Sequence, residues 1–118
     1  MFDSEINLIN GYLKEQLWMD FEMCNMSCGK LELYGFLDES GDDKIIIIFD
    51  QPYTVSCNFF FTYEGGGEFI WVVEGEEECQ INKRYGVTQG NVVFKIFNTN
   101  IESDMFIIAK GIEVQIKE

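Results

Sequence analysis

The sequence predicts a single, mainly β domain of the α+β class, with an antiparallel sheet that is curled or sandwich-like and one N-terminal helix. Apolar residues follow a helical period only before residue 18, and they alternate with polar residues in short runs after it. About seven or eight such runs, separated by turns rich in Gly, Asn or Asp, give the expected strands. A chain of 118 residues, 47% of them hydrophobic, can bury one core, and no linker or repeat divides it. We therefore expect residues 1–118 to form one domain.

The helix is predicted from Ser4 to Leu17. Ser4 is positioned to cap its N-terminus, and Glu5 would lie in its first turn. Gly11, inside the helix, costs up to about 1 kcal/mol relative to Ala, so the helix must gain its stability by docking an apolar face. That face is formed by residues spaced three or four apart: Ile6, Ile9, Leu13 and Leu17.

The next part of the chain is predicted to form strands and hairpins. Alternation starts at Met19 and continues after the turn Cys28-Gly29-Lys30, which predicts a hairpin. The run Ile45 to Phe49 is apolar on both faces, as in a central strand covered on both sides. Alternation from Tyr53 to Tyr63 predicts one long strand, and the glycines at 65–67 predict a turn into another hairpin.

The last third of the chain contains one ambiguous segment and three further strands. Cys79 to Tyr85 fits either a short helix closed by Gly86 or a strand, and both interpretations stay open. Val92 to Phe97, Met105 to Ala109 and Ile112 to Ile116 are strand-like runs.

The charge of the chain restricts its partners. Eight basic and 21 acidic residues leave a net charge of −13, which disfavours nucleic acid and anionic membrane surfaces and permits a basic protein partner. No apolar run approaches the roughly 20 residues that span a bilayer. Asp3 and Glu5 occupy positions where a secretory leader would carry basic residues, so we expect a cytoplasmic protein.

The residue types argue against an enzyme. The chain has no histidine, which removes the usual general base, the usual partner of a nucleophilic Ser or Cys, and the commonest metal ligand. A pair of carboxylates could act on a glycosidic bond, but 21 acids make chance pairing common. The glycines at 65–67 lack the Lys and Ser or Thr of a phosphate loop. We expect a protein without catalytic residues or cofactor.

The four cysteines are predicted to be free thiols without a metal. A four-thiolate zinc site takes its ligands from two close pairs, and only Cys24 and Cys28 are close in the sequence. The other two, Cys57 and Cys79, are isolated, and a chain with this much apolar material does not need disulfides to fold.

The candidate partner-binding residues are two acidic clusters and one aromatic anchor. Both clusters are predicted to lie in turns, where their charges reach solvent, and −13 exceeds the magnitude of about 2 to 8 that keeps a small domain soluble. The six residues are Asp42, Asp43, Glu76, Glu77, Glu78 and Trp71.

Several aromatic residues do not fit the obvious inward faces of the strands. They either pack against the helix or a second sheet, or they form an exposed interface, and both interpretations stay open. They are Trp18, Tyr34, Phe36, Phe60, Trp71 and Tyr85.

The general layout resembles that of a known group of proteins. A small acidic chain with a short leading helix, then Trp18, Asp20, Phe21 and Glu22, then a run of β-hairpins, resembles immunity proteins of bacterial polymorphic-toxin systems. The resemblance is one of layout, and it implies a protein that binds and blocks a cognate toxin, often a basic nuclease. The leading hypothesis is therefore a non-enzymatic, immunity-type inhibitor that masks a basic protein partner. The alternatives are a small-ligand-binding β domain with an aromatic cleft and a homo-oligomeric structural protein.

Overall fold

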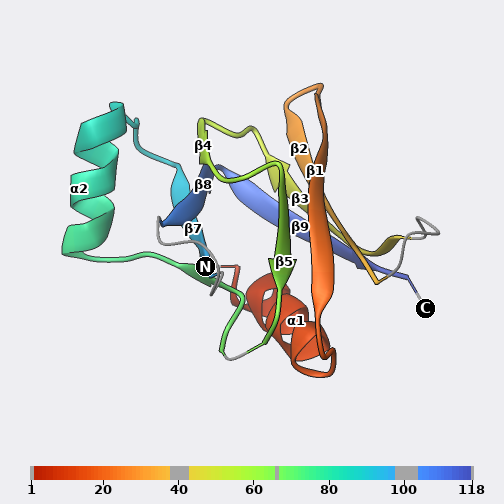
Figure 1. The fold of residues 1–118 in the computed structure, drawn as a ribbon. Coiled ribbons are helices and arrows are strands. Elements are labelled where there is room, and N and C mark those ends of the chain that lie inside the picture. The colour runs from red at the N-terminus through yellow and green to blue at the C-terminus, as the bar shows by residue number, and fades with distance from the viewer. Residues whose placement is uncertain (1, 38–42, 66, 98–103, 118) are drawn as a thin grey trace.

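The computed structural model describes residues 2–37, 43–65, 67–97 and 104–117. These residues form two antiparallel sheets and two helices (Figure 1). Sheet A has the order β5-β1-β2-β3-β9 and consists of β1 (Met19–Ser27), β2 (Lys30–Phe36), β3 (Asp43–Asp50), β5 (Phe60–Tyr63) and β9 (Gly111–Ile116). Sheet B has the order β4-β8-β7-β6 and consists of β4 (Thr54–Ser56), β6 (Ile70–Val72), β7 (Val92–Ile96) and β8 (Met105–Ala109). The predicted fold class is confirmed, with nine strands in the described residues instead of seven or eight.

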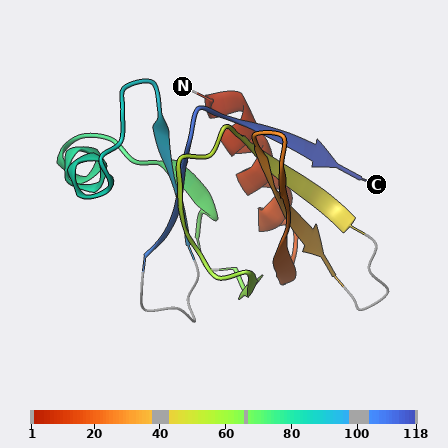
Figure 2. The same cartoon turned by 90° about the horizontal axis from the view of Figure 1, so that it is seen from above.

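The core lies between the inner faces of the two sheets. Phe21 and Ile47 of sheet A and Phe94 and Ile107 of sheet B are all fully buried in one cluster. The rings of Phe49 and Phe94 meet across the sheets, edge to face, with centroids 5.6 Å apart. Figure 2 shows α1 (Asp3–Lys14) on the inner side of sheet A and α2 (Glu76–Tyr85) on the outer side of sheet B.

Helix α1 is shorter than the sequence predicted. It ends at Lys14, so Leu17 lies beyond the helix and is 90% exposed. Ser4 is not its cap, because Phe2 precedes the helix in the left-handed conformation and no side chain caps the N-terminus. The rest of the prediction is confirmed, since Ile9 and Leu13 are the residues that α1 buries in the core.

The predicted strand from Tyr53 to Tyr63 is wrong. The structure divides it into β4, which pairs with β8 in sheet B, and β5, which pairs with β1 in sheet A. Residues 57–59 carry the chain from one sheet to the other. The alternation of apolar and polar residues continues through these three residues although the strand is interrupted there. The hairpin predicted at the glycines 65–67 is wrong for a related reason: β5 and β6, which this segment joins, belong to different sheets.

The segment whose structure the sequence left open is helical. Helix α2 ends at Tyr85. Gly86, the next residue, adopts φ 63°, and its N–H donates to the carbonyl oxygen of Asn82, a conformation that favours glycine. The expectation of a single helix is thereby corrected. No residue of α2 is buried, but Ile81 packs on a small cluster of the outer face of sheet B that includes Val93 and Phe106.

Strand β3 lies between two other strands, as its sequence predicted, but only one of its two faces is covered by another layer of the described structure (Figure 2). Ile45 and Ile47 face the core, whereas Ile46 and Ile48 face outward and are still only 8% and 7% exposed. In the described part of the chain, no helix or second sheet lies over these outer residues (Figure 2). The outer face of sheet A is therefore an open surface with apolar residues in its middle. Neither described helix is long and apolar enough to cross a membrane.

Candidate functional site

The outer face of sheet A brings aromatic and acidic side chains together. In antiparallel pairs, opposite residues point to the same face. The registers place Phe60, Glu22, Tyr34 and Ile46 side by side on β5, β1, β2 and β3. We call this surface the acidic–aromatic face and define it by Asp20, Glu22, Glu32, Tyr34, Phe36 and Phe60.

Hydrogen bonds hold two carboxylates of this face in place. Thr62 Oγ1 donates to Asp20 Oδ1 at 2.6 Å, between β5 and β1. Glu32 Oε2 accepts two hydrogen bonds, from Tyr34 Oη at 2.9 Å and from Asn25 Nδ2 at 3.0 Å. A surface that is ordered before it binds loses less side-chain entropy when it meets a partner.

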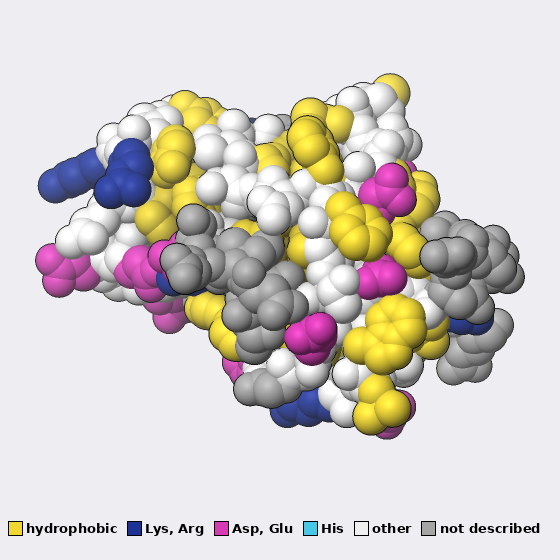
Figure 3. All heavy atoms as spheres, in the orientation of Figure 1, with side chains coloured by type: hydrophobic (Ala, Val, Ile, Leu, Met, Phe, Trp, Pro, Cys, Tyr) yellow, Lys and Arg dark blue, Asp and Glu magenta, His cyan; other side chains and the backbone are white. Residues whose placement is uncertain are grey.

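Two phenylalanines are exposed where β5 forms the edge of the sheet. Phe59 is 74% exposed and Phe60 is 54% exposed, and the ring of Phe60 lies 6.3 Å from that of Phe36. Figure 3 shows hydrophobic and acidic side chains interspersed over β1 and β5. Exposed aromatic residues that adjoin one another typically mark an interaction site in a soluble domain.

The first predicted acidic cluster touches this face only in part. Asp42 lies outside the described residues. Asp43 begins β3 and pairs with Phe36 after a shift in register, so its backbone lies at one end of the acidic–aromatic face.

The second predicted acidic cluster is helical, which corrects its placement in a loop. Glu76, Glu77 and Glu78 form the first turn of α2, where carboxylates offset the partial positive charge of the exposed N–H groups. Glu77 Oε2 accepts a hydrogen bond from Lys95 Nζ at 2.6 Å, and this bond is the main cause that raises the pKa of Lys95. Trp71 pairs with Lys95 in the register of β6 and β7.

The predicted site residues are therefore divided between two surfaces. Trp71 and Glu77 adjoin the same lysine on the outer side of sheet B, while Asp43 lies at the end of sheet A. Trp71 is half-buried against the cluster beneath α2, so packing uses part of its ring. The sequence reasoning missed Glu22 and Phe59 as site residues. The outward positions of the predicted hairpin from Met19 would have suggested Glu22.

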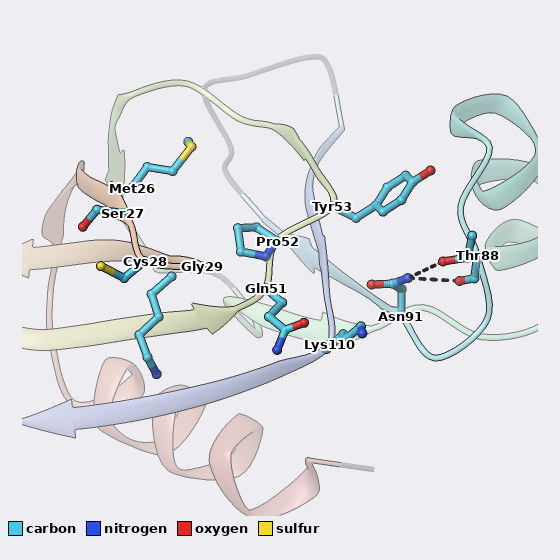
Figure 4. Close-up of a pocket in the computed structure, with 11 residues that line it drawn as sticks. Met26, Ser27, Cys28, Gly29, Gln51, Pro52, Tyr53, Thr88, Asn91 and Lys110 are labelled. Atoms are coloured by element: carbon cyan, nitrogen blue, oxygen red, sulfur yellow. Dashed lines mark hydrogen bonds between the residues drawn. The ribbon is translucent and has the colours of Figure 1, made fainter.

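Figure 4 shows the side chains that line a groove between the turn of the β1–β2 hairpin, Pro52-Tyr53 and Asn91. The groove has a volume of about 650 Å³. Asn91 Nδ2 donates to the carbonyl oxygen of Thr88 at 3.0 Å and to its hydroxyl at 3.3 Å. Lys30 and Lys110 line the groove, and none of its described lining residues is acidic.

The four cysteine thiols differ in their exposure to solvent. All four are free thiols, and Cys24, Cys28 and Cys79 are exposed. Burial raises the pKa of Cys57 to about 12, so its thiol stays protonated and weakly nucleophilic at neutral pH. Among the residues described, no three Cys, Asp or Glu side chains are grouped closely enough to hold a metal ion.

No family model matches this chain, and no curated protein or solved structure matches it. The candidate site therefore depends on the geometry of the acidic–aromatic face itself.

Proposed function

We propose that this domain is a non-enzymatic, cytoplasmic binding protein whose acidic–aromatic face covers a basic surface of a protein partner, in the manner of an immunity-type inhibitor of a toxin. The observation that carries the proposal is the exposed Phe60, which lies opposite Glu22 and whose ring is 6.3 Å from that of Phe36, on a face that no described helix or second sheet covers. Binding hot spots usually contain aromatic residues at the centre of the interface, with polar and charged residues around them.

The two kinds of side chain have separate roles in this proposal. Phe60 inserts into the partner surface, loses its contact with water, and thereby sets how long the complex lasts. Glu22, with Asp20 and Glu32, attracts basic residues and mainly sets how quickly the complex forms. The net charge of −13 favours a partner of opposite sign over the whole molecule.

A face built on strands suits a masking function. Five neighbouring strands fix the spacing of its side chains, and hydrogen bonds already hold Asp20 and Glu32. Such a surface can cover an active site without a change of shape, which is the behaviour of many tight inhibitors.

The ligand-binding alternative would use the groove between α2 and sheet B. This groove of about 370 Å³ contains the aromatic pair Tyr85 and Phe106, whose centroids are 5.6 Å apart. Four charged residues also line it, namely Glu77, Arg84, Lys95 and Asp104. Small-ligand sites are mostly apolar and closed, so this groove supports the alternative less well than the sheet supports protein binding.

The anchoring role is tested by measuring how fast the protein dissociates from the partner that the resemblance to immunity proteins implies, a toxin encoded by a neighbouring gene. We expect Phe60→Ala to speed dissociation by about 30-fold, because hot-spot truncations cost about 2 kcal/mol or more. Met26→Ala is the matched control, since Met26 is 62% exposed at the β1–β2 turn and lies outside the face. Equal dissociation rates for the two variants would reject the acidic–aromatic face as the binding surface.

A further inference from the structure

We propose that the protein forms a symmetric dimer in which β9 of one copy pairs antiparallel with β9 of a second copy. The two A sheets then become one continuous sheet. This inference is independent of the proposed function, because it concerns the opposite edge of sheet A from the exposed phenylalanines on β5.

Among the described residues, no strand pairs with the outer edge of β9. Lys117 N donates to Lys44 O at 2.8 Å and extends the register in which Ile116 pairs with Ile45. In an antiparallel ladder, alternate residues direct their N–H and C=O groups to the same neighbour. Residues 113, 115 and 117 thus bond toward β3, and Val114 and Ile116 point their backbone groups outward. Figure 2 shows β9 as the outermost strand on its side of the sheet.

Among the edge strands that the structure describes, β9 is best suited to pairing. It has six residues, whereas β5 has four and β4 and β6 have three each. The edge of β6 is also partly occupied, since Asn10 of α1 bonds to the backbone of Ile70. An edge strand without proline keeps all the outward N–H groups that a further strand would use.

The sequence of β9 is complementary to itself in one antiparallel register. With the two-fold axis at Gln115, Val114 lies opposite Ile116 of the partner subunit, and their outward backbone groups form the hydrogen bonds. Glu113 lies opposite Lys117 of the partner subunit, and the symmetry repeats both pairs. Two opposite-charge pairs then form on the outer face and two apolar pairs form on the inner face.

A hollow beside β9 would receive the second strand's inner side chains. Its volume is about 660 Å³, and Leu8, Gly11, Tyr12 and Ile116 are among its lining residues. Leu8 is 52% exposed, and a Cβ added at Gly11 would meet no atom within 4 Å. A glycine inside a helix costs about 1 kcal/mol relative to alanine. Contacts within one copy of the protein do not explain the glycine at this position, because they leave room for an alanine side chain. In the dimer, the space over Gly11 leaves room for the side chains of Val114 and Ile116 of the partner subunit, which lie on this side of the sheet.

The charge pairs give the sharpest test, by analytical ultracentrifugation of the whole chain over a range of concentrations. Lys117→Glu places like charges opposite each other twice, and we expect it to raise the dimer dissociation constant about 10-fold. Glu113→Lys alone places like charges opposite each other and also removes the ion pair that Glu113 forms with Lys30 at 3.0 Å, so it should weaken the dimer too. The double variant restores opposite charges across the axis and should dimerise more tightly than either single variant. Lys83→Glu is the matched control, because it changes the net charge equally on the exposed surface of α2.

A backbone variant tests the pairing without using charge. Val114→Pro removes an outward N–H that β3 does not use, so the fold should persist, seen by circular dichroism, while the dimer is lost. If Val114→Pro fails to fold, the charge series decides alone. A monomer at millimolar concentration, or a dimer with the same dissociation constant in Lys117→Glu and in the double variant, would overturn the proposal.

Discussion

The side chain of Asn10, on α1, forms hydrogen bonds with both backbone groups of Ile70, on β6. Asn10 Nδ2 donates to Ile70 O at 2.8 Å, and Ile70 N donates to Asn10 Oδ1 at 3.1 Å. The same oxygen accepts a hydrogen bond from Phe69 N at 2.9 Å. The amide thus bonds to the edge of β6 as a further strand would, and it joins the helix to sheet B inside the core.

Replacing Asn10 by alanine leaves three buried backbone groups without their partner. We expect Asn10→Ala to lower the free energy of unfolding by about 2–4 kcal/mol, because each unsatisfied buried group costs about 1–3 kcal/mol and the groups relax together. Urea denaturation measures the change. Asn7→Ala, on the exposed side of the same helix, should change stability by less than about 0.5 kcal/mol. Equal effects at the two positions would show that the buried amide is not a structural link.

The same substitution at two glycines should have opposite effects. A Cβ at Gly35, on β2, would lie 2.5 Å from Ile45 Cγ2 and 2.9 Å from Phe21 Cε1, so Gly35→Ala should cost about 2 kcal/mol or more. A Cβ at Gly11 meets open space, so Gly11→Ala should add about 0.5–1 kcal/mol of stability through helix propensity. Thermal unfolding of both variants checks the signs, and a gain at Gly35 would contradict the described packing of the sheet.

Stability should fall as the pH rises above about 9. The Cys57 thiol has an ordinary pKa of 9.0, which burial raises to about 12, and burial also raises the pKa of Tyr63. Between these pH values the unfolded chain has lost the Cys57 proton that the folded chain keeps, so the unfolded state gains stability. The pKa of Lys30, raised to about 12 by its hydrogen bond to Asp50, acts in the same direction above pH 10.5.

The contribution of Cys57 can be separated by substitution. In Cys57→Ala, the plot of unfolding free energy against pH should be less steep between pH 9 and 11 than in the original chain. Cys79→Ala, at an exposed cysteine, is the control and should leave the slope nearly unchanged. A slope that does not respond to Cys57→Ala would contradict the burial of this thiol.

The sequence predicted those elements whose signals are local. Met19 and Phe21 alternate with acids and do form β1, and the turn at Cys28 does join it to β2. The break between β4 and β5 could not be found in this way, because the alternation continues through residues 57–59 and no proline or glycine marks the change of sheet. Which strands belong to which sheet depends on contacts between distant segments, which a periodic pattern does not encode.

The candidate site was predictable only in its chemistry. The net charge of the chain indicated a basic partner. The three consecutive glutamates before Cys79 are also typical of the first turn of a helix, and the prediction of a loop overlooked this. The acidic–aromatic face depends on the registers that place Glu22 between Phe60 and Tyr34, and these follow from the pairing of β1 with both β5 and β2.

The two acidic surfaces can be ranked by their effect on association. Reversing Glu76 and Glu78 to lysine tests the cluster on α2 and leaves the ion pair between Glu77 and Lys95 intact. If this cluster also guides the partner, the double reversal should slow association by about 10-fold at low salt. An unchanged association rate would mean that only the acidic residues on sheet A guide the partner.

The association rate of Glu22→Lys with the neighbouring gene's product, at low and high ionic strength, tests the central claim most directly. The acidic–aromatic face predicts association about 3-fold slower or more at about 0.02 M salt, and a smaller difference at about 0.5 M, because salt screens exposed charges. Glu68→Lys, an exposed reversal outside the face, should slow association less. An association rate that responds equally to the two reversals, or to neither, would contradict the assignment of this face as the binding surface.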